Sequence, residues 1–124
     1  MELYQPYIEN LKRVYEEVLA LRAGSPTIVR ALDLYNPLVI VHRERNMEKE
    51  CTRCLEIFNT AVRQAASAFN VPLVSVHDAF NGPSHREDPR EKGYIGPTGI
   101  HASKRGKRVI ADLLSRVGYE PLEP

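Results

Sequence analysis

Apolar side chains recur every three to four residues over the first part of the chain, with charged residues between them. Within residues 3–21 the apolar positions are Tyr4, Tyr7, Ile8, Leu11, Val14, Tyr15, Val18 and Leu19. This spacing predicts an amphipathic helix with one buried face. We expect it to end before residue 26, because Gly24 permits a left-handed cap and Pro26 cannot continue a helix.

Two short runs rich in β-branched residues, 27–32 and 71–76, predict strands. Between them, a loop containing Asn36 and Pro37 precedes a second helical pattern over residues 47–69. Residues 77–102 are rich in Gly and Pro, which predicts a long connection of the kind that carries function. A last helix is predicted from an N-cap at Ser103 to a C-cap at Gly118, and its apolar face is Val109, Ile110, Leu113, Leu114 and Val117.

The predicted order is helix, strand, helix, strand, helix, which favours right-handed crossovers and a parallel sheet covered by helices. A chain of 124 residues has the length of one domain. Two strands, however, are too few for the sheet that such helices normally cover. We therefore expect residues 1–124 to be a single partial α/β domain.

Bulk charge gives no indication of a charged partner. The formal net charge is +1, with 17 basic and 16 acidic residues, which provides no argument for attraction to nucleic acid, acidic membranes or acidic substrates. The sequence also contains neither a run of apolar residues long enough to span a membrane nor a secretory signal. We expect a soluble chain, cytoplasmic if it is complete, although a secreted parent protein stays open.

Cysteine and histidine could form a metal site, but their spacing gives little support for one. Cys51 and Cys54 fall on the apolar stripe of the predicted helix 47–69, which favours structural packing, and no second Cys/His pair completes a zinc set. A set taken from His42, His77, His85, Asp78 and Asp88 matches no known ligand pattern. We expect neither a metal nor a cofactor.

Ligands of open parallel sheets bind beyond the carboxyl ends of the strands. The polar residues predicted there are Asp33, Tyr35, Asn36, His42, Arg43, Arg45, His77, Asp78 and, at the end of the long loop, His101. An imidazole on a loop suits general base catalysis, although a lone His before a helix is more often solvated or capping. The cations at the start of the last helix are more consistent with a solvated face than with an anion site; they are Lys104, Arg105, Lys107 and Arg108.

The stretch GYIGPTGIHASKRGKRVIADLL, residues 93–114, resembles the last sequence block of the SGNH (GDSL-type) esterase and lipase superfamily, Asp-Gly-Ile-His-Pro-Asn followed by Gly-His and an apolar helix. Residues 21–37, 58–76 and 79–83 resemble the preceding segments of the same superfamily, in order. The resemblance implies an incomplete three-layer α/β/α unit of flavodoxin-like type with parallel strands. It also implies hydrolysis of small-molecule or lipid esters through an acyl-serine.

The resemblance assigns His101 the role of the family's catalytic histidine, a general base, and Gly106 that of the glycine in the last helix. Thr98 stands where the family has the Asp that orients the histidine. A threonine hydroxyl can hydrogen-bond an imidazole but adds no charge, so the triad would be weakened. Asp78 or Asp88 could substitute. Ala102 and Ser103 replace the family's Pro and Asn.

The family's Gly-Asp-Ser nucleophile block and its Gly-x-Asn-Asp oxyanion block are not in this sequence. Of the serines present, only Ser84 is predicted on a loop at the functional edge, and nothing around it resembles a nucleophile elbow. We therefore expect the carboxyl-terminal half of a serine ester hydrolase, inactive alone. The alternative is a non-catalytic remnant acting as a binding or oligomerisation module. The unpaired edge of the first strand predicts a homo-oligomer or association with a missing amino-terminal half.

Overall fold

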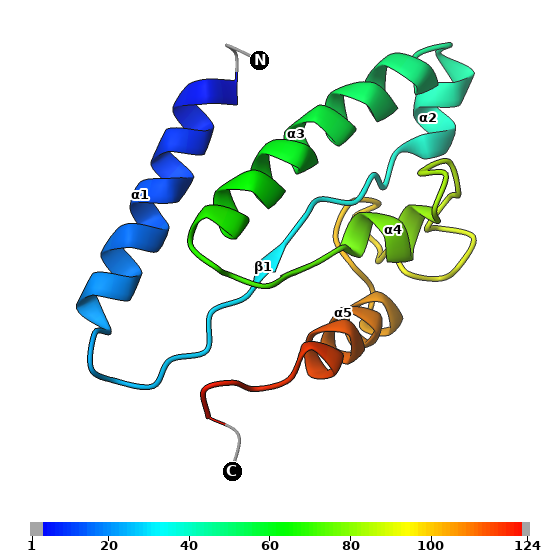
Figure 1. The fold of residues 1–124 in the computed structure, drawn as a ribbon. Coiled ribbons are helices and arrows are strands. Elements are labelled where there is room, and N and C mark those ends of the chain that lie inside the picture. Colours follow the sequence, from blue (N-terminus) through cyan, green and yellow to red (C-terminus); the bar gives the residue numbers. More distant parts are fainter. Residues whose placement is uncertain (1–3, 123–124) are drawn as a thin grey trace.

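A computed structural model describes residues 4–122 of the chain and contains, within that range, five helices and two strands. The elements are α1 (Gln5–Leu21), β1 (Ala31–Leu32), α2 (Val39–Glu44), α3 (Glu48–Ala68), β2 (Leu73–Val74), α4 (Val76–Asn81) and α5 (Lys104–Val117) (Figure 1). Helices and parallel strands alternate along most of the chain, so the predicted α/β class is confirmed.

The sheet consists of β1 and β2, which pair in parallel with Ala31 opposite Leu73 and Leu32 opposite Val74. Both strands are two residues long, much shorter than the predicted 27–32 and 71–76. A stretch of chain counts as a strand only where it pairs with a neighbouring strand. Among the described residues β1 and β2 pair only with each other, so the β-branched runs predicted as strands are longer than the paired segments.

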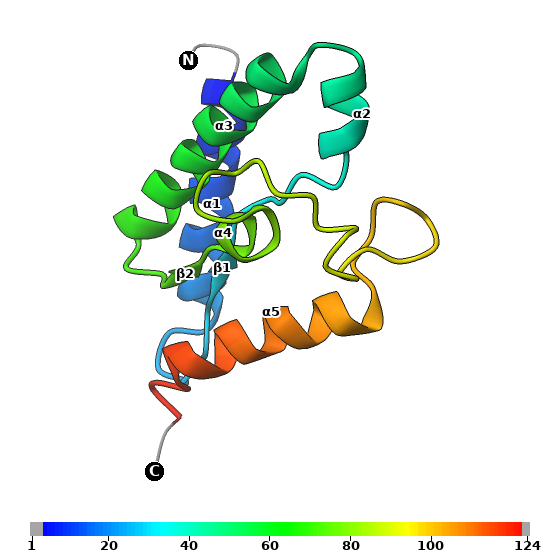
Figure 2. The ribbon, with the colours of Figure 1, turned by 90° about the vertical axis from the view of Figure 1, so that its right-hand side faces the viewer.

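Helices lie on both sides of this small sheet. α1 and α3 pack side by side on one side, while α5 lies across the sheet from them and contacts β2 and α4 (Figures 1 and 2). Small residues on α3 allow α1 and the strands to approach closely. The main core cluster is Ile8, Tyr15, Ala31, Ala61, Ala65, Ala66 and Val71.

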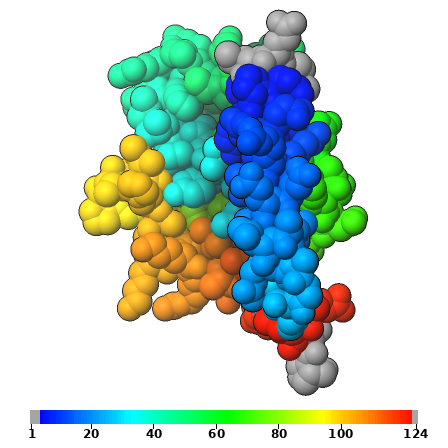
Figure 3. Space-filling view, turned by 90° about the vertical axis from the view of Figure 1, so that its left-hand side faces the viewer, coloured from blue at the N-terminus to red at the C-terminus, as the bar shows by residue number. Residues whose placement is uncertain are grey.

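The amphipathic pattern of α1 is confirmed as a helix, but its predicted buried face is only partly covered. Position 3, where the prediction began, lies outside the described residues. Ile8 and Tyr15 are buried, whereas Val14 is 55% and Val18 38% exposed. The cause is that α1 packs mainly against α3, so side chains that face away from α3 stay in solvent. Figure 3 shows α1 in blue, with the cyan residues around β1 beside it and open to solvent.

The helical pattern of residues 47–69 is confirmed as α3, but the burial predicted for its cysteines is wrong. Cys51 is partly exposed and Cys54 is exposed. Tyr4, at the start of α1, contacts the ring of Phe58 at 5.7 Å between centroids. Residues 48–57 of α3 therefore extend beyond the described part of α1, and their apolar stripe is only partly covered.

Two short helices occupy positions predicted as loop or strand. α2 replaces part of the loop before α3. Just before the first residue of α2, the Asn36 side chain accepts the N–H of Leu38 over 2.9 Å. α4 replaces the end of the predicted second strand and the beginning of the long connection. The Ser75 hydroxyl caps α4 by accepting the N–H of Asp78 over 3.1 Å, which stabilises a helix start within an apolar run.

The last helix is confirmed at both ends. The Ser103 hydroxyl accepts the N–H of Gly106 over 3.0 Å, and Gly118, with φ of 89°, follows the last residue. Gly106 is the buried residue of α5 and lies against Tyr94 and Phe80. None of the helices in the described part of the chain combines the length and hydropathy needed to cross a bilayer.

Candidate active site

The loop between α4 and α5 folds back on itself just before α5. Ile95 and Ala102 form an isolated antiparallel bridge, and the N–H of Gly96 donates to the carbonyl of His101 over 2.8 Å. Residues 97–100 make the tight turn between them, in which Gly99 has a φ of 78°, a conformation that glycine adopts without strain. The backbone of His101 is therefore fixed by the turn at the entrance to α5.

The hydroxyl of Thr98 lies at the centre of this turn. Its Oγ1 accepts the N–H of Ile100 over 3.3 Å and that of His101 over 3.0 Å, and it lies 3.1 Å from Nδ1 of His101. A hydroxyl has two acceptor lone pairs and one proton. Because backbone N–H groups occupy both lone pairs, the proton is free to point at Nδ1. That arrangement favours the tautomer of His101 with its hydrogen on Nε2.

Tyr35 joins this turn to the segment that follows β1. Its hydroxyl donates to the carbonyl of Ile100 over 2.9 Å, and its ring packs on Phe80 at 4.6 Å between centroids. Burial raises the pKa of Tyr35, so the phenol stays protonated and remains a donor at neutral pH. His101 is thereby held near the carboxyl end of β1, the edge where ligands of parallel sheets bind.

No serine hydroxyl within residues 4–122 hydrogen-bonds His101, whose side chain is exposed. Ser84 lines a hollow of about 550 Å³ beside the start of α3, and His101 is not part of its lining. Asp78 and Asp88 do not contact His101 either, because Asp78 binds His85 and Asp88 accepts the N–H of Arg90. The remaining serines also have other places in the fold. Ser25 and Ser67 are exposed, Ser75 and Ser103 cap α4 and α5, and Ser115 hydrogen-bonds the hydroxyl of Tyr119.

The buried polar residues after β1 form a structural network. The carboxylate of Asp33, 3% exposed, accepts the Ser75 hydroxyl over 2.7 Å and the N–H of His77 over 2.9 Å. The side chain of Asn81 accepts the N–H of Asn36 and donates to its carbonyl, each over 2.8 Å. These bonds join the chain after β1 to α4, and each satisfies a group that would otherwise be buried unpaired.

The other residues predicted at this edge are dispersed. His42 contacts Asn36, with 3.3 Å between Nδ1 and Nδ2, and Arg43 pairs with Glu48 at 2.7 Å. Arg45 is exposed, as are the cations of the first turns of α5, Lys104, Arg105, Lys107 and Arg108. Within the described residues, no group of three or more His, Cys, Asp or Glu side chains is placed to hold a metal ion.

A stacked pair of histidines, predicted only as separate loop residues, lies between α3 and α4. The rings of His77 and His85 are 3.7 Å apart between centroids and nearly parallel at 16°. His85 contacts Glu56 over 2.9 Å and Asp78 over 2.5 Å, whereas the Nε2 of His77 is buried without a partner. No sequence signal pairs these rings, because a left-handed residue at His85, φ 62°, brings them together.

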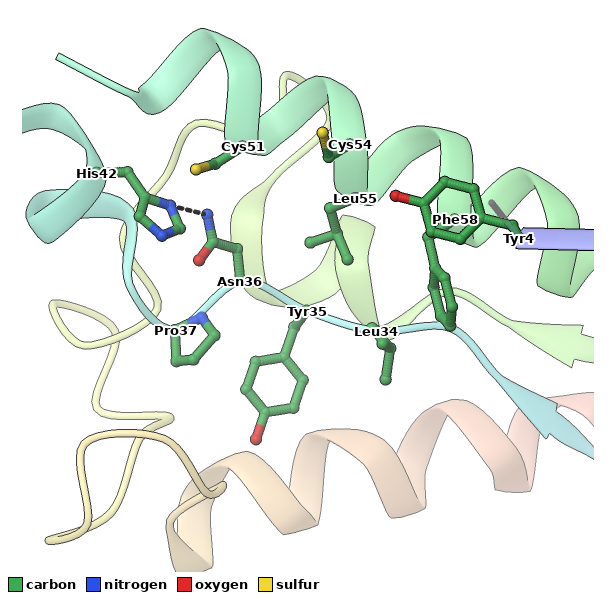
Figure 4. Close-up of a pocket in the computed structure, with 10 residues that line it drawn as sticks. All are labelled: Tyr4, Leu34, Tyr35, Asn36, Pro37, His42, Cys51, Cys54, Leu55 and Phe58. Atoms are coloured by element: carbon green, nitrogen blue, oxygen red, sulfur yellow. Dashed lines mark hydrogen bonds between the residues drawn. The ribbon is translucent and has the colours of Figure 1, made fainter. Parts of the chain in front are cut away.

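An apolar cavity of about 390 Å³ lies between α3, the start of α1 and the segment after β1 (Figure 4). Its lining is Tyr4, Leu34, Tyr35, Asn36, Pro37, His42, Cys51, Cys54, Leu55 and Phe58. The volume is at the lower end of the range for small-molecule sites. Because Tyr35 also holds the turn of residues 96–101, one side chain connects the cavity to His101.

The chain is similar to the spore germination lipase LipC of Bacillus licheniformis, with 26% identity over 117 residues. The similarity covers 93% of this chain and 49% of the lipase, so the chain spans about half the length of the curated relative it matches. No protein-family model and no solved structure matches the sequence. The similarity suggests a relationship to a lipase, and hence a hydrolase-like fragment.

Proposed function

We propose that the chain is the carboxyl-terminal part of a serine ester hydrolase of SGNH type, with His101 as its general base. The observation that carries this proposal is the fixed turn of residues 96–101, which holds an exposed imidazole at the carboxyl end of β1. The similarity to a lipase supports ester hydrolysis as the reaction class. The substrate is a small-molecule or lipid ester.

In this proposal the nucleophilic serine belongs to a segment outside residues 1–124. Nε2 of His101 accepts the proton of that serine as its oxygen forms a bond to the ester carbonyl carbon. The imidazolium then returns the proton to the departing alkoxide, which leaves as an alcohol. In the second half, His101 takes a proton from water as the water oxygen bonds to the acyl carbon. The imidazolium then returns that proton to the serine oxygen as its bond to the acyl carbon breaks, which releases the acid and restores the serine.

The hydrogen bonds that Thr98 makes in this structure do not favour the tautomer of His101 that a general base requires. A general base needs a free lone pair on Nε2, whereas the contacts of Oγ1 favour a hydrogen there. For His101 to act, the threonine must give up its weaker backbone bond, the 3.3 Å bond from Ile100, and accept from Nδ1–H instead. A carboxylate in its place would accept that hydrogen directly and stabilise the imidazolium.

The same proposal treats residues 1–124 as one partial domain of a three-layer α/β/α unit. A two-stranded sheet in which β1 has no second strand partner among residues 4–122 supports this interpretation. The partner that completes the sheet is the amino-terminal part of the same hydrolase. In its absence a second copy of this chain would occupy the edge.

A fluorophosphonate probe, which bonds to activated serines, tests the proposal. We expect no labelling of the isolated chain and no turnover of a short-chain nitrophenyl ester. The native protein, isolated with any preceding segment or tightly bound partner, should be labelled on a serine outside residues 1–124. His101→Ala should lower its activity about 10³-fold or more. Thr98→Asp should raise it about tenfold or more by favouring the active tautomer.

His85→Asn serves as the matched control, because it removes a histidine that contacts Glu56 and Asp78 but not the turn. It should leave labelling unchanged. Labelling of Ser84 in the isolated chain would contradict the proposal, as would a His101→Ala protein labelled like the unmodified one. A native protein with no reactive serine at all would favour the binding or oligomerisation module instead.

A further inference from the structure

The cavity bounded by α3, the start of α1 and the segment after β1 differs in polarity between its two ends. One end is formed by aromatic and aliphatic side chains, among them Phe58, Leu55 and Tyr4. At the other end lie the hydrogen-bonded Asn36 and His42 (Figure 4). A ligand that matches both ends has a hydrocarbon tail and a polar head, since burying either half against the opposite chemistry would cost free energy.

The position of the cavity connects it to the candidate active site. Its floor is the segment after the carboxyl end of β1, residues 34–37, where parallel sheets bind ligands. Tyr35 lines it and also donates to the carbonyl of Ile100, the residue before His101. A molecule bound along residues 34–37 would therefore lie on the segment that also carries Tyr35.

We propose that this cavity binds the straight-chain acyl group of the ester, with the hydrocarbon tail toward Phe58 and the carbonyl end toward Asn36 and His42. The assignment of the ligand as an ester's acyl group rests on the proposed function. Binding itself does not require catalysis, so it can be measured on the chain as it stands. Failure to bind and failure to hydrolyse are therefore separate results.

The two cysteines provide a local readout. Cys51 and Cys54 are free thiols, and both line the cavity. An acyl chain in the cavity would cover them, and alkylation by N-ethylmaleimide should slow. Because the sequence holds no other cysteine, the mass of the alkylated protein reports on this cavity alone.

The experiment titrates the chain with a dansylated undecanoic acid and displaces it with straight-chain carboxylates from butyrate to decanoate. Affinity should rise with chain length by up to about fourfold for each methylene that the cavity buries. Decanoate should also slow alkylation of both thiols. Equal affinity for butyrate and decanoate, or unchanged alkylation at saturating decanoate, would overturn the proposal.

Two leucines on the same segment give a matched pair of variants. Leu34 is 50% and Leu32 42% exposed, so neither replacement empties the core, but only Leu34 lines the cavity. Leu34→Arg should weaken decanoate binding about tenfold or more by placing a charge against the tail, while Leu32→Arg should not. If both variants bind like the unmodified chain, or both lose binding equally, the fatty acid associates with the exposed apolar surface and the cavity is not its site.

Discussion

The stacked histidines show how the environment sets the charge of two identical side chains. His77 is 2% exposed, and its burial, reinforced by the neighbouring His85, lowers its pKa below the ordinary 6.5. Burial acts in the same direction on His85, but its hydrogen bonds to Asp78 and Glu56 outweigh burial and raise its pKa above 6.5. The fold therefore favours the neutral form of His77 and the charged form of His85.

These opposite shifts predict a pH-dependent stability difference. The contribution of His85 is fully present below the unfolded pKa and is lost as pH rises through its raised folded value. The contribution of His77 has a different pH dependence. As the pH falls below 6.5, the unfolded state binds a proton on His77 that the folded state does not bind, so the free energy of unfolding decreases. His85→Asn, which suits the left-handed backbone there, should cost up to about 1 kcal/mol at acid pH and less as pH rises above neutrality.

Urea unfolding of both proteins at about pH 5.5 and about pH 8.5 measures this difference. Glu56→Gln combined with Asp78→Asn is the matched control, because it removes the pairing charges and keeps the ring. It should flatten the pH dependence to the same extent. A stability gap that is equal at both pH values would mean that His85 carries no stabilising charge.

Among the elements, periodicity predicted the long helices and missed the short ones. α1, α3 and α5 each present several turns of apolar spacing, which is enough for the 3.6-residue period to stand out. α2 and α4 are six residues each, too short for a repeating pattern to stand out. Local hydrogen bonds mark their starts: Asn36 accepts the N–H of Leu38 just before α2, and Ser75 caps α4. The predicted strands were too long because β propensity marks residues that suit a strand, whereas pairing decides which of them form β1 and β2.

The candidate site was predictable only in part. The resemblance identified His101 and Thr98, and its assignment of their roles stays a prediction. The anchoring of the turn by Tyr35 depends on a contact across 65 positions of sequence, and no local pattern encodes it. The occupied lone pairs of Thr98 likewise follow from the tight turn, which fixes backbone donors that spacing alone does not place.

α5 provides a test of element packing through Gly106. A Cβ there would overlap the carbonyl oxygen of Tyr94 and lie 3.1 Å from the ring of Phe80. That carbonyl is held in place by the N–H of Ser103 over 2.7 Å. Alanine favours helices by about 1 kcal/mol over glycine, yet the overlap should reverse the sign, and we expect Gly106→Ala to destabilise the chain by about 2 kcal/mol.

Chemical unfolding compares this variant with Lys107→Ala, an exposed change in the next position of the same helix. The control should change stability by less than about 0.5 kcal/mol. Because Tyr94 adjoins the turn that holds His101, Gly106→Ala should also broaden the His101 signals in NMR spectra. A Gly106→Ala protein as stable as the unmodified chain would show that α5 packs less closely than the structure indicates.

On the scale of the whole molecule, α1 and β1 both leave apolar side chains exposed. Tyr7, Val14 and Val18 of α1 and Leu32 of β1 are each more than a third exposed. Exposed apolar side chains, together with a strand edge that has no partner among the described residues, are typical of an association site. The proposed partial domain accounts for it, since the sheet would continue from β1 into another chain segment.

The unpaired edge predicts that the isolated chain associates. The N–H of Ala31 donates to Pro72, so that of the next residue, Leu32, points outward because alternate residues of a strand face opposite neighbours. Light scattering at about 10 µM should therefore detect a dimer or larger species. Leu32→Pro removes that outward donor and should weaken association about tenfold, whereas Leu32→Val keeps both the donor and an apolar side chain and should not. A monomeric unmodified chain would refute the prediction, and equal association of the two variants would locate the contact away from the β1 edge.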